Sequence, residues 1–287
     1  MKKLIIALLL CMPFAETLKA SNIGEDLKST AASFNIISYN IRLDTEGDGI
    51  NVWRNRKEKV SGLLRFHGAD IFGLQEALPN QVADIVQEFT DFGFVGVGRD
   101  DGKSAGEHMM IFYRLSRFEK LDDGTFWLSE TPEKPGFGWD AHHNRTVTWI
   151  KLRDKISHQQ FYLFNTHFDH RGEVARRSSS NLLLAKIESI NKEKLPVVVT
   201  GDFNAIKESE PIQLILKQLI DSRTISQSAP YGPEYTSGGF EVKQNSRIID
   251  YIFVTKGVNV LRHGILSDSF GVYYPSDHLA VLAEISL

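Results

Sequence analysis

The stretch Leu195-Pro-Val-Val-Val-Thr-Gly-Asp-Phe-Asn204 decides the fold, because a run of valines passes directly into a polar turn. Consecutive β-branched residues predict a buried strand. Asp202 and Asn204 follow at the carboxyl end of that strand. In α/β folds, the loops after strand ends hold ligands on a rigid base. The stretch therefore predicts a core strand with a functional site at its end.

The same arrangement recurs along the chain, where apolar strands end in residue types that bind metal ions or phosphates. These residues are Asn40, Glu76, His167, Asp250 and the adjacent pair Asp277 and His278. A single Asp or Asn at a strand end is usually a turn former or a helix cap. Six such clusters, with Asp202 and Asn204 counted as one, make coincidence a poor explanation. Their carboxylate and amide oxygens suit a hard divalent cation such as Mg²⁺.

The rest of the chain alternates strand-like and helix-like runs. Apolar runs predict strands at 34–41, 70–76, 92–97, 108–114, 147–152, 161–168, 196–200, 248–254, 259–266 and 279–285. Amphipathic patterns predict helices at 53–66, 79–89, 173–191 and 211–220. No repeat, low-complexity tract or long linker divides them. We therefore expect residues 34–287 to form one α/β domain of two packed sheets flanked by helices.

Residues 1–20 are predicted to be a signal peptide. Lys2 and Lys3 precede the apolar run 4–12, which is too short to span a membrane. We expect a secreted or periplasmic protein without a transmembrane segment, in which residues 21–33 form an N-terminal linker. A lipid anchor at Cys11 is the weaker alternative, because Leu10 occupies the place where a small residue should precede the cysteine.

Composition excludes several classes of protein. The 287 residues include 33 basic and 36 acidic side chains, and 24% are charged, as in ordinary soluble proteins. Removal of residues 1–20 leaves 30 basic and 35 acidic side chains, a balance that disfavours binding of long DNA. Cys11 is the only cysteine, so the chain can form neither an internal disulfide nor a thiolate metal cluster.

The order of the short motifs resembles the endonuclease/exonuclease/phosphatase superfamily, which includes pancreatic deoxyribonuclease. The motifs are Ser38-Tyr-Asn-Ile-Arg42, Leu74-Gln-Glu76, Asn165-Thr-His167, Gly201-Asp-Phe-Asn204, Arg247-Ile-Ile-Asp-Tyr251 and Pro275-Ser-Asp-His278. The resemblance implies a four-layered α/β sandwich of two mostly antiparallel β-sheets flanked by helices. The segments 106–114, 124–130 and 138–140 resemble the secreted bacterial branch, which is similar to the deadenylase–nocturnin group.

The resemblance implies a magnesium site, with manganese as an alternative metal. Glu76 is the expected metal ligand, and Asn40 stands beside it as a ligand or a polar neighbour. Asp277 completes the acidic surface around the metal. A divalent cation in such a site stabilises charge on phosphate oxygens.

The resemblance also implies a catalytic group around the scissile phosphate. His278 is expected to act as general base on the attacking water or to stabilise the transition state. Asp250 would accept a hydrogen bond from His278 and fix its tautomer. Asp202 and Asn204 would orient the water and a phosphate oxygen, and His167 would bind the phosphate from the other side. A buried polar pair that supports the sheet is the alternative for Asp250 and Asn204.

Three further residues are expected to bind substrate. Arg145 is a candidate for bidentate contact with a phosphate, with a surface salt bridge as the alternative. Glu107 is expected to line the site, although an acid at a strand edge is often only solvated. His170 follows His167 closely, and a polar turn before the helix explains it equally well.

The sequence therefore predicts a secreted or periplasmic, Mg²⁺-dependent phosphoesterase. A phosphodiesterase for a small nucleotide, an oligonucleotide or a lipid head group is favoured over a nuclease on single-stranded DNA or RNA and over a phosphomonoesterase. A glycosidase that uses Glu76 and Asp202 and a non-catalytic binding module stay open as other classes. No protein partner is evident, and we expect a monomer.

Overall fold

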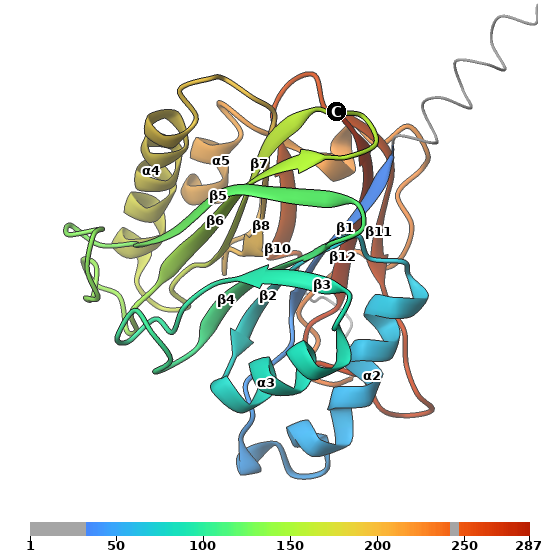
Figure 1. Ribbon diagram of the computed structural model, residues 1–287. Coiled ribbons are helices and arrows are strands. Elements are labelled where there is room, and N and C mark those ends of the chain that lie inside the picture. Colours follow the sequence, from blue (N-terminus) through green and yellow to red (C-terminus); the bar gives the residue numbers. More distant parts are fainter. Residues whose placement is uncertain (1–32, 242–246) are drawn as a thin grey trace, which may run out of the picture. The chain divides into compact units, whose positions relative to one another are not determined.

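Two six-stranded β-sheets face each other in the computed structural model, which describes residues 33–241 and 247–287 (Figure 1). Sheet A has the strand order β11-β12-β1-β2-β4-β3, and sheet B has the order β5-β6-β7-β8-β10-β9. The strands of sheet A are β1 (Phe34–Asn40), β2 (Ile71–Ala77), β3 (Phe92–Val95), β4 (His108–Arg114), β11 (Asn259–Leu266) and β12 (Ala280–Ser286). Those of sheet B are β5 (Phe118–Trp127), β6 (Thr146–Asp154), β7 (Gln160–His167), β8 (Val197–Asp202), β9 (Ile220–Asp221) and β10 (Asp250–Val254).

Each sheet contains one parallel strand pair among antiparallel neighbours. In sheet A the pair is β1–β2, and in sheet B it is β7–β8. The last partners of the second pair are His167 and Asp202. Since the carboxyl ends of parallel strands lie at the same edge of a sheet, each pair presents two strand ends together. The predicted fold of two mostly antiparallel sheets is confirmed.

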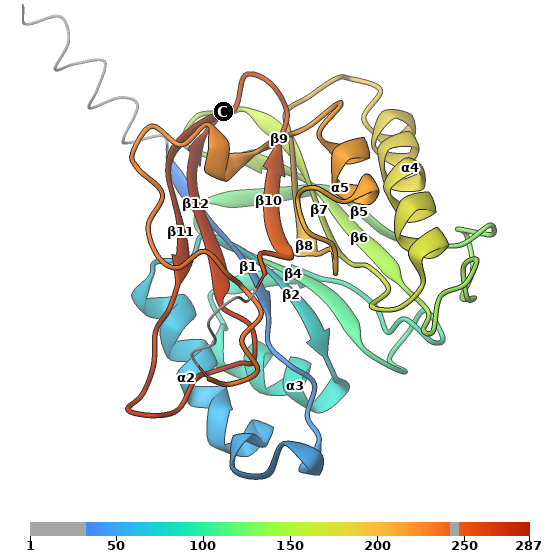
Figure 2. The ribbon, with the colours of Figure 1, turned by 180° about the vertical axis from the view of Figure 1, so that it is seen from behind.

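Helices cover the outer face of each sheet and complete four layers (Figures 1 and 2). The helices are α2 (Trp53–Phe66), α3 (Pro79–Glu88), α4 (Glu173–Ile190), α5 (Glu210–Ile215) and the 3₁₀ turns η1 (Glu46–Asn51) and η2 (Ser222–Thr224). In α2, the buried side chains of Trp53, Val60 and Leu64 pack with sheet A. Leu183 and Ile187 of α4 pack with sheet B in the same way. The helical period of the apolar residues therefore determines which face of each helix is buried.

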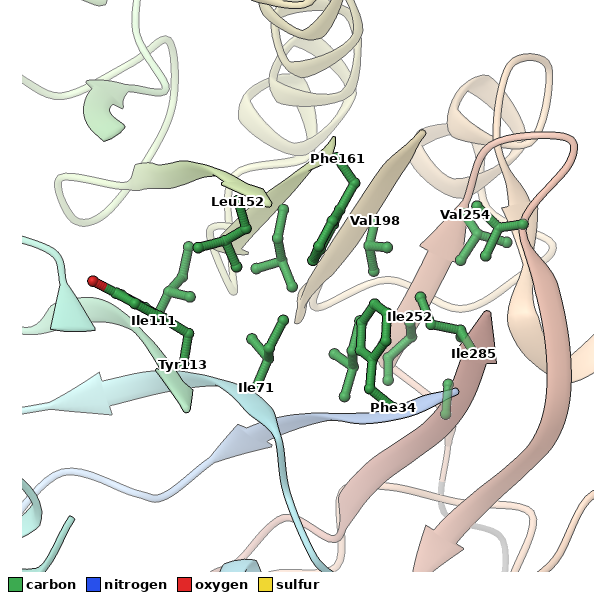
Figure 3. Packing of buried hydrophobic residues seen from close by; sticks show 14 of the residues in the cluster. Phe34, Ile71, Ile111, Tyr113, Leu152, Phe161, Val198, Ile252, Val254 and Ile285 are labelled. Carbon is green, nitrogen blue, oxygen red and sulfur yellow. The ribbon is translucent and has the colours of Figure 1, made fainter. Parts of the chain in front are cut away.

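The space between the sheets is apolar at one end and polar at the other. Phe161 and Val198 of sheet B point across this space toward Ile71 of sheet A (Figure 3). Burial of such side chains contributes about 1.5–3 kcal/mol each. Along β7, Leu163 belongs to this core, whereas Asn165 is a buried amide that binds sheet A. The strands thus run from a hydrophobic core into a polar layer.

Two strands were missed in the sequence, β5 and the two-residue strand β9. Strand β5 includes exposed residues such as Glu119 and Lys120, because it is the edge strand of sheet B. Its outer positions therefore lack the apolar alternation that predicts a strand. The predicted helix at 211–220 is also shorter, because α5 ends at Ile215 and Ile220 begins β9.

The predicted signal peptide and Cys11 lie outside the described residues. Within 33–241 and 247–287, no helix is long and apolar enough to cross a membrane.

Candidate active site

Residues at the ends of the two parallel strand pairs meet across the gap between the sheets. Asn40 ends β1, and its Nδ2 donates to Oε1 of Glu76 and to Oδ2 of Asp202, at 3.0 Å each. Glu76 belongs to sheet A, whereas Asp202 ends β8 in sheet B. One buried amide therefore connects the carboxylates of the two sheets.

The backbone at these strand ends adopts unusual conformations. The pairing of β2 with β4 shifts register between Leu74 and Ala77, which places Glu76 in a β-bulge with a φ of 63°. Asn204, two residues after the end of β8, has a φ of 47°. A non-glycine residue with positive φ costs of order 1–3 kcal/mol and persists where its surroundings hold it. Bulges of this kind re-aim side chains next to functional sites.

His278 forms a buried pair with Asp250. Its Nδ1 lies 2.9 Å from Oδ2 of Asp250, and its Nε2 lies 3.8 Å from Oδ2 of Asp202. Burial opposes protonation of His278, but the Asp250 and Asp202 carboxylates raise its pKa well above the ordinary value. Burial and the charge of Asp250 raise the pKa of Asp202 to about 7. The group therefore holds an imidazolium beside a carboxyl group that titrates near neutral pH.

His167 is a neutral imidazole on the other side of Asp202. Its Nε2 lies 3.0 Å from Nδ2 of Asn204 and 3.5 Å from Oδ2 of Asp202. Burial, followed by the charges of Arg145 and Arg99, lowers the pKa of His167 well below the ordinary value. Asn204 also donates its backbone N–H to Oδ1 of Asp202 at 2.9 Å. The predicted residues His167, Asp202 and Asn204 thus form one hydrogen-bonded group.

Several groups around Glu76 stabilise its charged form. Oε2 accepts the backbone N–H of Leu43 at 3.1 Å, and the Arg42 guanidinium lies 4.0 Å away. Burial works against ionisation, but the Asn40 amide, His278 and these two groups together lower the pKa of Glu76. Asp277 lies on the same side, 3.9 Å from Arg42.

Two sets of side chains in the site could hold a divalent cation. Glu76 and Asp277 supply carboxylates, and Asn40 contributes a polar neighbour whose Oδ1 accepts the backbone N–H of Arg42. These are oxygen donors of the kind that Mg²⁺ prefers. Asp202, Asp250 and His278 are a second set, with ligand atoms within 4.8 Å of one another. Since Nδ1 of His278 is already hydrogen-bonded to Asp250, we assign this second set to acid–base chemistry.

Arg145 is a buried cation rather than the side chain of a surface salt bridge. Its Nε lies 3.4 Å from Oδ2 of Asp169, and its Nη2 lies 3.2 Å from Nδ1 of His170. Its Nη1 is buried and has no hydrogen-bond partner within 33–241 and 247–287. An unpartnered guanidinium N–H is a donor for a phosphate oxygen.

Glu107 is buried beside His167 and does not form a solvated strand edge. Its Oε2 is 2.5 Å from Nη1 of Arg99 and 4.0 Å from Nδ1 of His167. Burial raises the pKa of Glu107, although Arg99 acts in the opposite direction. Arg99 was missed in the sequence, because a single arginine in a glycine-rich loop gives no signal for a buried ion pair.

Asp169 holds two loops beside the site. Its carboxylate accepts the backbone N–H groups of His142, His143, Arg171 and Gly172 at 2.8–3.3 Å. Burial opposes ionisation of Asp169, but these hydrogen bonds and Arg145 lower its pKa to about 2. The side chains of His142 and His143 are exposed and lie near His170, with ring centroids 6.0 and 5.6 Å from it. The adjacent pair His142 and His143, shortly before Arg145, is the sequence feature that could have predicted this loop as part of the site.

Comparisons with known proteins identify the family of this chain. The model of the Endonuclease/Exonuclease/phosphatase family matches residues 37–278. An endonuclease/exonuclease/phosphatase from Bacteroides vulgatus is 39% identical, with a TM-score of 0.85 over 89% of this chain and 99% of that one. A mannosyl-6-phosphatase from Bacteroides thetaiotaomicron is 34% identical, with a TM-score of 0.84 over 88% of this chain and 100% of that one.

Human nocturnin is a more distant relative, 23% identical over 91% of this chain and 67% of that protein. The predicted relationship to the deadenylase–nocturnin group is confirmed. The chain spans 62% and 41% of two mimivirus proteins that it also matches. The family match covers most of the chain and includes every strand-end residue of the site from Asn40 to His278. The chain therefore belongs to the endonuclease/exonuclease/phosphatase family of phosphoester-hydrolysing enzymes.

Proposed function

We propose that this protein is a divalent-metal-dependent hydrolase of small phosphate esters. The observation that supports it best is the pair of carboxylates on the two sides of Asn40. The pKa of Glu76 is lowered, whereas burial and Asp250 raise the pKa of Asp202 to about 7. Paired titratable groups whose pKa values are pushed apart usually have different roles in catalysis. Glu76 would stay charged and bind a cation, and Asp202 would exchange a proton.

Each residue of the site would have its own role in the reaction. Glu76, with Asn40 and Asp277 beside it, would hold Mg²⁺ or Mn²⁺, which offsets negative charge on the phosphate oxygens when bound. The Asn204 amide would orient the attacking water, and Asp202 would take its proton. As the water oxygen bonds to phosphorus, the bond to the leaving oxygen breaks, and that oxygen takes a proton from solvent water to leave as an alcohol. His278 is held as an imidazolium by Asp250, so its Nε2–H donates to a phosphate oxygen. Of the two roles expected for His278, its raised pKa favours stabilisation of the transition state.

Arg145 and His167 complete the phosphate contacts on the side of sheet B. The unpartnered Nη1 of Arg145 would donate to a phosphate oxygen. His167 is uncharged, and its Nδ1 is a buried donor without a hydrogen-bond partner among the described residues. Both groups are therefore fixed before substrate binds, which favours electrostatic stabilisation of the transition state.

A phosphorylated carbohydrate is the substrate class that we favour, in place of the diester favoured by the sequence. The chain is 34% identical to a mannosyl-6-phosphatase and covers the whole of that solved chain. Beside Arg145, the exposed imidazoles of His142, His143 and His170 present donors and acceptors. Burial and nearby guanidinium groups lower the pKa values of His143 and His170. Uncharged imidazoles suit sugar hydroxyls better than a second anion.

A substrate comparison tests the proposal. The purified protein would be given mannose 6-phosphate, p-nitrophenyl phosphate, bis-p-nitrophenyl phosphate and a single-stranded oligonucleotide, each with Mg²⁺ and with excess EDTA. We expect metal-dependent phosphate release that is fastest from the sugar phosphate. Hydrolysis that persists in EDTA, or no hydrolysis of any of the four, would contradict the proposed function. Faster cleavage of the diester would restore the phosphodiesterase alternative.

We also propose export, on the sequence of residues 1–20 alone. Cell fractionation of the full chain and of a variant without residues 1–20 would test it. Export of both, or of neither, would contradict the proposal.

A further inference from the structure

A layer of buried amides and hydroxyls separates the apolar core from the active site. Its members are Ser38, Gln75, Asn165 and Thr200, and each has no exposed surface. Asn165 stands two residues before His167 on β7, and Thr200 two residues before Asp202 on β8. Each of these strands therefore places a polar residue directly beneath a residue of the site, because side chains alternate with a period of two.

Asn165 is the centre of this layer and crosses from sheet B to sheet A. Its Nδ2 donates to the backbone carbonyls of Leu74 at 2.9 Å and Met110 at 3.0 Å. Its Oδ1 accepts from Nε2 of Gln75 at 2.7 Å and from Oγ1 of Thr200 at 3.1 Å. A side-chain amide has two donor hydrogens and two acceptor lone pairs, so Asn165 uses all of its capacity.

The two carbonyls lie where the bulge that positions Glu76 begins. Leu74 and Met110 are partners in the β2–β4 pairing, and the next partners are Ala77 and His108. Glu76 lies between these two pairs and has a φ of 63°. The amide of Asn165 therefore bonds to both strands at the last regular pair before the chain turns Glu76 toward the site.

Gly73 shows how closely the sheets approach at this point. A Cβ atom at Gly73 would lie 2.7 Å from both Oδ1 of Asn165 and Oγ1 of Thr200. Real Cβ atoms essentially never have such short contacts. Strand β2 can therefore approach the amide of Asn165 only because position 73 has no side chain.

From these contacts we propose that Asn165 is the positioning residue for Glu76. By bonding to Leu74 and Met110, a residue of sheet B fixes the bulge of sheet A and so the direction of the carboxylate. The inference rests on the proposed function in one respect, namely that Glu76 binds the divalent cation. Asn165 does not itself reach the site, because its four hydrogen bonds are made within the buried layer.

Metal binding separates a positioning role from a merely stabilising one. Mn²⁺ would be titrated into the full chain, and free Mn²⁺ would be followed by electron paramagnetic resonance. Changes to residues that orient metal ligands typically weaken binding by about 10–100-fold. We expect Asn165→Ala to weaken Mn²⁺ binding by at least about 10-fold. At saturating Mn²⁺, its kcat should return to within a few-fold of the parent.

Thr200→Val is the matched control. It removes one hydrogen bond from the same buried amide and keeps the shape of the side chain, but it leaves both bonds from Nδ2 in place. Its Mn²⁺ affinity should stay within a few-fold of the parent, even if it lowers thermal stability as much as Asn165→Ala does. Equal loss of affinity in the two variants would contradict the inference.

Gly73→Ala tests the same bulge without changing Asn165. The added methyl would displace the amide, so this variant should also bind Mn²⁺ weakly. It replaces Asn165→Ala if that variant does not fold. Parental Mn²⁺ affinity in a folded Asn165→Ala or Gly73→Ala protein would overturn the inference. Failure of the parent itself to bind Mn²⁺, or binding that survives Glu76→Ala, would instead overturn the proposed function.

Discussion

The two parallel strand pairs deliver residues to the site in the same way but in different chemical states. In sheet A, the last partners of the pair β1–β2 are Asn40 and Gln75, and Glu76 follows Gln75 in β2. In sheet B, the pair β7–β8 ends with His167 and Asp202. The pKa of Glu76 is lowered although the group is buried, whereas burial and Asp250 raise that of Asp202 to about 7.

The difference arises from the neighbours of the two carboxylates. Leu43 N–H and the Arg42 guanidinium face Glu76, so its charged form is stabilised. Asp202 lies fully buried close to the second carboxylate Asp250, so two negative charges compete in a place of low dielectric. Similar backbone geometry thus gives one carboxylate with a lowered pKa and one with a raised pKa, and we propose that the first binds the cation and the second exchanges the proton.

The largest expected effect is on the side of sheet B. Asp202→Asn keeps the shape of the side chain but removes the proton acceptor, so kcat should fall by about 10²–10⁴-fold. Mn²⁺ affinity should stay within a few-fold of the parent. Asp221→Asn is a control, because Asp221 is another buried carboxylate of sheet B, and it caps η2 rather than lining the site. Loss of Mn²⁺ binding in Asp202→Asn would show that the two sheets do not have separate roles.

Replacement of Glu76, the corresponding carboxylate of sheet A, is expected to lower activity by weakening metal binding. Glu76→Gln should weaken Mn²⁺ binding by about 10–100-fold, and activity at low Mn²⁺ should fall accordingly. Excess Mn²⁺ should restore part of the activity, unlike in Asp202→Asn. Glu119→Gln, at an exposed ion pair with Arg153, should leave both measurements unchanged. An activity loss in Glu76→Gln with normal Mn²⁺ affinity would assign Glu76 to the chemistry and not to the cation.

Arg145, on the side of sheet B, is expected to contact the phosphate group of the substrate. Arg145→Lys keeps the positive charge near Asp169 but loses the planar fork. A hydrogen bond to a charged group is worth about 1.5–3 kcal/mol, so KM for the phosphate substrate should rise roughly 10–100-fold. Steady-state kinetics would measure this rise. If KM and kcat are both unchanged, Arg145 serves only to pair with Asp169.

The smallest expected effect concerns stability at low pH. The pKa of Asp169 is lowered to about 2 in the folded protein, below the value of about 3.9 for an unperturbed Asp. The stabilisation is therefore present above about pH 4 and is lost as pH falls toward 2. Between these pH values the melting temperature of the parent should fall more than that of Asp169→Asn, by roughly 2–4 °C. Parallel curves for the two proteins would mean that Asp169 has an ordinary pKa.

Much of the fold could be predicted because the regular elements show their period in the sequence. The helix at 53–66 and the strand at 108–114 have the predicted bounds. Strand β5 could not be predicted, since an edge strand alternates less clearly between buried and exposed residues. The strand-end residues of the site were predicted from their types and order, and the structure brings them together.

The backbone conformation of these residues, their burial and the contacts that hold them could not be predicted in the same way. The left-handed conformation of Glu76 depends on a bulge between strands that are distant in sequence. Burial of Arg145 and the pairing of Glu107 with Arg99 depend on how loops pack against sheet B. Such features follow from long-range contacts, and the local pattern of residues does not specify them.

The hydrogen bonds of Asp169 determine which side chains of the neighbouring loop can be exchanged. Asp169 contacts His142 and His143 through their backbone N–H groups, and any residue except proline supplies such a group. The exposed side chains at 142 and 143 can therefore be exchanged without loss of the carboxylate that anchors the loop. Since we propose that these side chains contact the substrate, saturation mutagenesis of the two positions should alter substrate preference while the loop stays anchored.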